Sequence, residues 1–236
     1  MLFGDAMLNF RFKDTLEILP ASNGVEWLKE SWSIFTLAPV KILGATIIYL
    51  LFNMLLGLIP VAGPLLSFLL FPATSAGLIY FISSIDNNSG TSFAYLFQFI
   101  NKKFILTGAI MGLLALCVGA ALGLIAFGTF YLLGLGLGTI FILIVFLVLT
   151  IGYFCVIAIF WLSIPILVFH DDVTISDALK LAYNAVKFNW LPLIVNGLVC
   201  IILMALGSLI IVGALIMIPI CFICMYCAYK DILIQK

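Results

Sequence analysis

The twenty Lys, Arg, Asp and Glu side chains of this 236-residue chain lie outside its long apolar segments, apart from Lys41 at the very start of the first one. A charged side chain at the centre of a bilayer is costly, whereas a helix of about 20 apolar residues can cross the hydrocarbon layer. The distribution of charge therefore predicts an all-α, polytopic membrane protein.

The composition supports this class. Hydrophobic residues make up 66% of the chain and charged residues 8%, against about 25% charged in an ordinary soluble domain. The net charge is zero, so the sequence does not indicate nucleic acid as a partner. The first 24 residues lack the compact apolar region of a signal peptide, and we expect the first span to act as an uncleaved signal anchor.

Six spans are predicted within a single transmembrane domain, residues 25–236, which follows an N-terminal segment of residues 1–24. Pro60 separates the first two spans, and the glycine-rich stretch 128–138 divides an uncharged block of 66 residues, 104–169, which by length alone admits two long spans or three short ones. The predicted spans are residues 40–58, 61–83, 104–126, 139–168, 191–209 and 214–229.

The ten Lys and Arg residues decide between six spans and seven. Cytoplasmic loops of membrane proteins carry an excess of these residues. Six spans place all ten on one side of the membrane, whereas seven would move the last four to the other side. We therefore expect a protein of the bacterial inner membrane with both termini in the cytoplasm.

A repeated unit is visible in the segments before the hairpins. Each hairpin is preceded by a predicted interfacial amphipathic helix, and the second span of each hairpin contains one proline. Thr174 and Asp177 resemble a capping box at the start of the third amphipathic helix. The apolar faces are Val25, Leu28, Trp32 and Phe35; Phe93, Phe97, Ile100 and Phe104; and Ala178, Ala182, Val186 and Trp190. The prolines are Pro72, Pro165 and Pro219.

Residues 20–232 resemble an uncharacterised family of bacterial six-span integral membrane proteins of unknown function. The resemblance implies the fold and no activity. The shared motifs include Leu58-Ile59-Pro60-Val61-Ala62-Gly63-Pro64-Leu65, Phe160-Trp161 with Pro165 ahead of His170-Asp171, Asn189-Trp190-Leu191-Pro192, and Tyr226-x-Ala228-Tyr229-Lys230-Asp231.

The sequence predicts no catalytic residue, cofactor site or metal site, and we expect the protein not to be an enzyme. The lone histidine, His170, stands beside Asp171 and Asp172 and is interpreted as part of a solvated linker. The spacing Cys221-x-x-Cys224-x-x-Cys227 superficially resembles that of cluster ligands, but it lacks a loop and a nearby fourth ligand. The sequence Gly134-x-Gly136-x-Gly138 is interpreted as an outer turn.

Two sets of residues are candidates for helix packing. Small residues spaced four apart allow a second helix to approach closely, either within this chain, which we favour, or from another copy. Single amides in apolar helices form hydrogen bonds between helices or line a polar cavity. The candidates are Gly108, Gly112, Ala115, Gly119 and Gly123, with Asn53 and Asn196 as the amides.

A third set predicts contact with membrane lipids or with other membrane proteins. Its tryptophans suit the headgroup region and its lysines suit phosphate or acidic groups of a partner. The set comprises Trp27, Trp32 and Trp190 with Lys29, Lys102, Lys103, Lys180 and Lys187. We expect a non-enzymatic scaffold, an envelope-assembly factor or a lipid-interacting module. A small transporter or channel for an uncharged or lipid-like substrate is the alternative.

Overall fold

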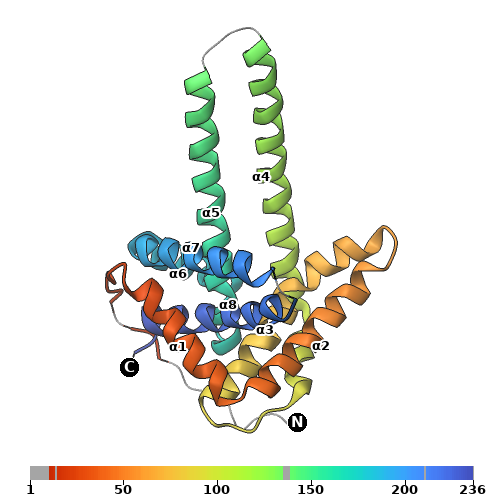
Figure 1. The fold of residues 1–236 in the computed structure, drawn as a ribbon, viewed down its shortest axis with the longest axis vertical. Coiled ribbons are helices and arrows are strands. Elements are labelled where there is room, and N and C mark those ends of the chain that lie inside the picture. Colours follow the sequence, from red (N-terminus) through yellow and green to blue (C-terminus); the bar gives the residue numbers. More distant parts are fainter. Residues whose placement is uncertain (1–10, 14, 135–138, 210, 236) are drawn as a thin grey trace.

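The computed structural model describes residues 11–13, 15–134, 139–209 and 211–235, which form an all-α fold (Figure 1). Eight α-helices and one short 3-10 helix occur in this part of the chain. Six of the helices are long and apolar enough to cross a membrane. The elements are α1 (Asn23–Leu37), α2 (Pro39–Gly57), α3 (Ala62–Asp86), η1 (Phe93–Phe97), α4 (Lys102–Gly134), α5 (Thr139–Phe169), α6 (Ile175–Phe188), α7 (Trp190–Gly207) and α8 (Ile211–Leu233).

The six candidate spans of a multi-pass membrane protein are thus confirmed, and most of their ends fall within three residues of the predicted ones. The largest difference is in α4, which continues to Gly134 instead of ending at residue 126. Its sequence remains apolar up to that point, so nothing in its composition ends it earlier. The predicted outer turn at Gly134, Gly136 and Gly138 falls largely on residues 135–138, outside the described residues.

The long helices differ in how much of each is buried. We call α3, α5 and α8 the inner helices, because between 50% and 56% of the residues in their apolar windows are buried. We call α2, α4 and α7 the outer helices; only 22% of the window is buried in α2 and 17% in α7. In Figure 1 the α4–α5 pair extends far beyond the rest of the molecule, and α7 and α8 run across it near its base. Each inner helix contains its predicted proline.

Small residues let the inner helix α3 pack closely against its neighbours. Its run Ala73–Gly77 is entirely buried. At Gly77 an added Cβ would collide with the backbone carbonyl of Leu96 in η1. Helix association in lipid depends on close van der Waals packing rather than on the hydrophobic effect. A glycine at this position therefore allows the backbone of η1 to lie directly on α3.

The prediction of a second amphipathic helix, with its apolar face from Phe93 to Phe104, is wrong. The structure has only the five-residue η1 there, and its buried residue is Leu96, whereas Phe93, Phe97 and Ile100 are exposed. The Asn101 side chain accepts a hydrogen bond from the Phe104 backbone N–H at 3.2 Å, close to the start of α4. This local bond favours a new helix start over continuation of the preceding turn.

Helices α1 and α6 occupy the positions of the other two predicted amphipathic helices. On α1 the predicted apolar face is rotated, because the buried face is formed by Gly24, Trp27, Ser31, Ile34 and Phe35, while Val25 and Trp32 are exposed. On α6 the predicted residues Ala178, Ala182 and Val186 are buried.

The start of α6 has the N-cap bond of the predicted capping box, and the Asp177 carboxylate bonds to the Thr174 hydroxyl. The Thr174 hydroxyl oxygen accepts from the Asp177 backbone N–H at 3.2 Å, and the hydroxyl donates to the Asp177 carboxylate at 2.7 Å. Thr174 is the N-cap residue, so the side chain satisfies a backbone donor that has no partner inside the helix.

Candidate functional site at the charged end

The three inner helices meet where each of them ends. The ring of Phe169, the last residue of α5, lies between aromatic rings of the other two helices. Its centroid is 6.4 Å from that of Tyr80 on α3, 5.9 Å from Tyr226 and 5.5 Å from Tyr229 on α8. We call this region, with the polar side chains that follow each helix end, the charged end of the molecule.

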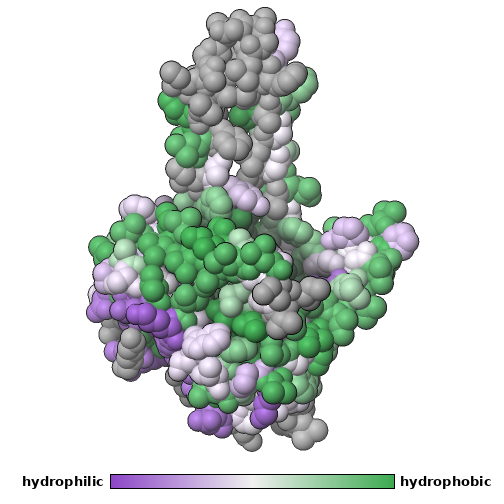
Figure 2. All heavy atoms as spheres, viewed as in Figure 1, coloured by the Kyte–Doolittle hydropathy of each residue, from purple (hydrophilic) through white to green (hydrophobic). Residues whose placement is uncertain are grey.

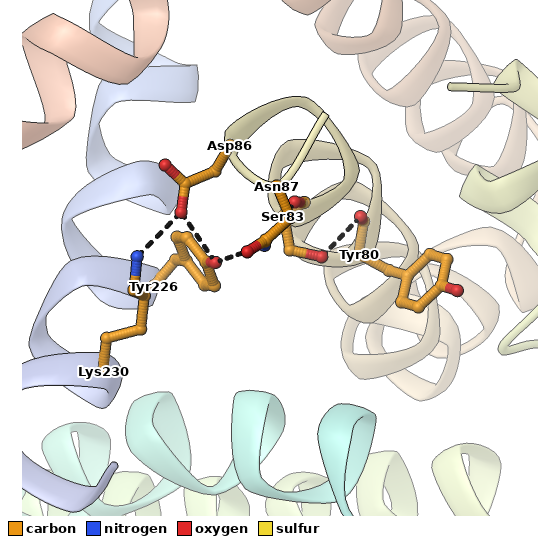
Figure 3. Close-up of polar contacts among 6 residues, drawn as sticks. All are labelled: Tyr80, Ser83, Asp86, Asn87, Tyr226 and Lys230. Atoms are coloured by element: carbon orange, nitrogen blue, oxygen red, sulfur yellow. Dashed lines mark hydrogen bonds and ion pairs between the residues drawn. The ribbon is translucent and has the colours of Figure 1, made fainter. Parts of the chain in front are cut away.

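The first polar group of the charged end joins α3 to α8 through Asp86 (Figure 3). Lys230 pairs with the Asp86 carboxylate at 2.7 Å, and the Tyr226 hydroxyl donates to the same oxygen at 3.0 Å. Asn87 donates to the Tyr226 oxygen at 3.2 Å and to the Ser83 carbonyl at 2.8 Å. The side chains of Asp86 and Lys230 are only 18% and 30% exposed. These partly buried bonds hold the ends of two inner helices together.

The second polar group joins α1 to α8 through Asp231. One carboxylate oxygen accepts from Asn23 at 2.8 Å and from the Trp27 indole N–H at 3.0 Å. The prediction that Trp27 lies at a lipid headgroup is therefore wrong, since the side chain is 1% exposed and its N–H is bound within the protein. An indole can be buried where its one donor finds an acceptor.

The third polar group surrounds His170, which is 8% exposed rather than part of a solvated linker. Its Nε2 lies 2.9 Å from the Tyr229 hydroxyl, and the Phe12 ring stacks on it with 3.8 Å between centroids. Burial lowers the pKa of the imidazole; Asp172 opposes this shift and Lys103 adds to it. His170 is therefore held in its neutral form at neutral pH.

An N-terminal segment crosses this region in extended form. Phe12 and Ile234 form an antiparallel bridge, in which the Lys13 N–H donates to the Leu233 carbonyl and the Gln235 N–H to the Arg11 carbonyl, both at 2.9 Å. The Lys13 ammonium donates to the Asp231 backbone carbonyl at 2.8 Å. Both ends of the described chain consequently lie side by side on the charged end.

The bonds of the first two groups connect helices to one another. Each carboxylate in the first two groups is bound by cations, amides or ring donors of the same chain, and each bond joins different elements. Within the described residues, no three His, Cys, Asp or Glu side chains lie together as a metal site. Cys224 is buried on α8, with its sulfur 3.3 Å from the Ser31 hydroxyl of α1.

The predicted small-residue stripe on α4 divides into two parts. A Cβ on Gly108 would collide with the Leu69 carbonyl of α3, and one on Gly112 would lie 3.1 Å from the Phe68 ring. Around Gly119 and Gly123, by contrast, no heavy atom of the described residues lies within 4 Å of an added Cβ. Among the described residues, the predicted close packing within the chain is therefore seen at Gly108 and Gly112, and it stays a prediction at Gly119 and Gly123. The side chain of Ala115 lies outside the described residues.

The two predicted amides have different roles. Asn196 is 2% exposed, and its Nδ2 donates to the Gly24 carbonyl at 3.0 Å, which joins α7 to α1. Asn53 donates to the Tyr49 carbonyl one turn earlier in its own helix at 2.8 Å. The described bond of Asn53 therefore lies within α2 rather than between helices.

Most of the remaining interfacial candidates lie on the surface. Trp32 and Trp190 are 52% and 55% exposed, and Lys29, Lys102 and Lys187 are exposed. Lys180 is exposed and lies 3.5 Å from Asp177. Lys103 is half-buried, with its ammonium 3.5 Å from the Leu167 carbonyl of α5.

The sequence-based candidates omitted Asp86, Tyr226, Lys230, Asp231 and the contact role of His170. Their common signal is position: each is a polar or aromatic residue within the last two turns of an inner helix or directly after it. In a membrane protein, such positions allow polar side chains of different helices to meet outside the hydrocarbon.

Compared with protein-family models, with curated proteins and with solved structures, the chain matches none. The six candidate spans thus characterise the protein as a polytopic helical membrane protein.

Proposed function

We propose that the protein is a non-enzymatic scaffold of the bacterial inner membrane that binds anionic lipid headgroups at its charged end, with both termini in the cytoplasm. The observation that carries the proposal is a division among the polar groups of this end. Asp86 and Asp231 at the ends of α3 and α8 are bound by donors of the same chain, whereas lysines and tryptophans of the surrounding elements are exposed.

The exposed set lies on elements around the inner helices. Trp32 is on α1, Lys102 begins α4, Lys180 and Lys187 are on α6, and Trp190 begins α7. A shallow depression on α6 is lined by Ser176, Leu179, Lys180, Tyr183 and Asn184. Figure 2 shows hydrophilic surface along the lower and lower-left edges of the molecule, below a broad hydrophobic region. Lysines and amphipathic aromatic rings are the side chains that suit an anionic headgroup layer.

Lipid retention tests the proposal. One variant would carry glutamine in place of four lysines: Lys102, Lys103, Lys180 and Lys187. Its co-purified lipids would be measured by native mass spectrometry. Each lysine near an anionic leaflet is worth about 1 kcal/mol, so the variant should lose most of its bound anionic lipid. A control with Glu26→Gln, Asp171→Asn and Asp172→Asn removes exposed acids and should keep that lipid.

Two other outcomes would redirect the proposal. If the lysine variant keeps its anionic lipid but loses a co-purified protein, the surface binds a protein partner instead. If neither changes, and Asn196→Leu abolishes a biological activity in a folded protein, the transporter alternative is favoured.

Orientation needs its own test. In a cysteine-free background, reporter cysteines at Ser89 and Ser176 should resist a membrane-impermeant thiol reagent applied to intact spheroplasts. A reporter at Val61, which is 97% exposed in the turn between α2 and α3, should react. Labelling of Ser176 from outside would contradict the proposed orientation.

A further inference from the structure

The described N-terminal residues 11–13 and 15–19, which we call the strap, lie across the charged end without belonging to any helix. Phe12, Leu16 and Leu19 are partly buried against the core. Most of the strap's polar contacts use its backbone, including the Leu19 N–H, which donates to the Asn189 side-chain oxygen at 2.8 Å. Backbone bonds of this kind hold an extended segment without requiring it to fold with the helices.

The strap covers an ionisable group. Phe12 stacks on His170 with 21° between the ring planes, and the imidazole is nearly inaccessible to solvent. His170 follows α5 directly and bonds to Tyr229 of α8. The covered position favours the neutral imidazole, because a protonated ring placed there is cut off from the water that would hydrate it.

The charged groups around His170 shift its pKa in opposite directions. Asp172, in the turn after α5, favours the protonated imidazole, and Lys103 of α4 disfavours it. Asp171 is adjacent in sequence, and Lys13 of the strap has its ammonium at the Asp231 carbonyl and 3.6 Å from Glu17. Tyr229 is the facing group on α8. Burial therefore has the largest influence on the charge of this residue, and Phe12 covers one face of its ring.

We propose that the strap is a proton-sensitive device, held down while His170 is neutral and released when the imidazole takes up a proton. Release lets the imidazole ring reach water, and the same step separates Phe12 from His170 and the strap from the end of α8. Because binding of a proton and opening of the strap are linked, each must favour the other by the same factor.

The first experiment uses the fact that His170 is the only histidine in the chain. NMR of histidine-labelled protein in nanodiscs therefore reports this group alone. Opening the site with Phe12→Ala should move the titration midpoint upward, towards the ordinary value of about 6.5. Residue 12 lies before the first described helix, and circular dichroism of the variant would check that the helical fold is kept. Identical midpoints in the two proteins would overturn the proposal.

The second experiment follows the strap itself. Hydrogen exchange of residues 11–19 would be measured from pH 7.5 to 5.0, with labelling times scaled to intrinsic exchange. Wild-type protection should fall below about pH 6.5 by up to tenfold per pH unit, until the closed-state pKa is reached. His170→Gln should remove this dependence, and residues 175–188 of α6 should stay protected throughout. An equal fall in His170→Gln, or no fall in the wild type, would contradict proton-controlled release.

Discussion

Gly108 and Gly119 belong to the same small-residue stripe of α4, yet they lie in different surroundings. Near its start, α4 lies so close to α3 that a Cβ on Gly108 has no room beside the Leu69 backbone. At Gly119, by contrast, no heavy atom of the described residues lies within 4 Å of an added Cβ, and α4 and α5 extend beyond the rest of the molecule (Figure 1). Small residues therefore permit close packing, but they do not show where a partner helix lies.

The difference follows from where the polar contacts are. Lipid tails are as apolar as leucine side chains, so an apolar helix face gains little by exchanging lipid for protein. At the charged end, Asp86 forms an ion pair with Lys230, and both Asp86 and Asp231 accept hydrogen bonds. These contacts hold particular helices together. The distal part of α4 and α5 has no charged residue, so its sequence offers no ion pair that would select a neighbouring helix.

The largest expected effect separates the two parts of the stripe. Gly108→Leu inserts a side chain where two backbones meet, and we expect a loss of about 3 kcal/mol or more. Gly119→Leu places the same side chain in open space and should change stability by less than about 0.5 kcal/mol. Thermal unfolding in mild detergent measures both.

If Gly119→Leu proves as harmful as Gly108→Leu, the distal stripe has a partner in the membrane. Size-exclusion chromatography would then distinguish a second copy, since an oligomer present in the wild type should dissociate in the variant.

The spans could be predicted from the sequence because hydropathy is local: each needs only a run of about 20 apolar residues. The N-cap at Thr174 is equally local, since Thr174 and Asp177 are three positions apart. The face of α1 was not predictable in this way. Its apolar residues surround much of the helix, and the acceptor that buries Trp27 is the distant residue Asp231.

The contacts of the charged end share that limit. Asp86 and Lys230 lie far apart in the chain and meet only because α3 and α8 lie side by side. Charge patterning indicated on which side of the apolar helices they lie. It did not indicate which charges remain exposed and which pair.

A double-mutant cycle on this pair should show an intermediate effect. We expect a coupling energy of about 1–2 kcal/mol between Asp86→Ala and Lys230→Ala, because the carboxylate and the ammonium are partly buried and 2.7 Å apart. The matched exposed pair is Asp177–Lys180, with side chains 55% and 74% exposed and 3.5 Å apart. Its coupling should be near zero. Equal couplings for the two pairs would mean that the Asp86 pair is solvated.

The smallest expected effect concerns the start of α6, where a local contact replaces the long-range contacts of the inner helices. Thr174→Ala removes the N-cap and should destabilise the helix by about 1 kcal/mol, whereas Thr174→Ser should retain most of the capping.

The Thr174 hydroxyl is the main cause of a lowered Asp177 pKa. A carboxyl group with a lowered folded pKa stabilises the protein above its unfolded value of about 3.9, and this stabilisation is lost as the pH falls through the folded value. Protection of residues 175–178 against hydrogen exchange, relative to the intrinsic rate, should therefore fall below about pH 4 in the wild type. It should depend less on pH in Thr174→Ala. The Trp27–Asp231 contact should keep α1 protected in both proteins. If α1 and α6 lose protection together in Thr174→Ala, the local cap and the long-range contacts form one cooperative unit, and the distinction between them fails.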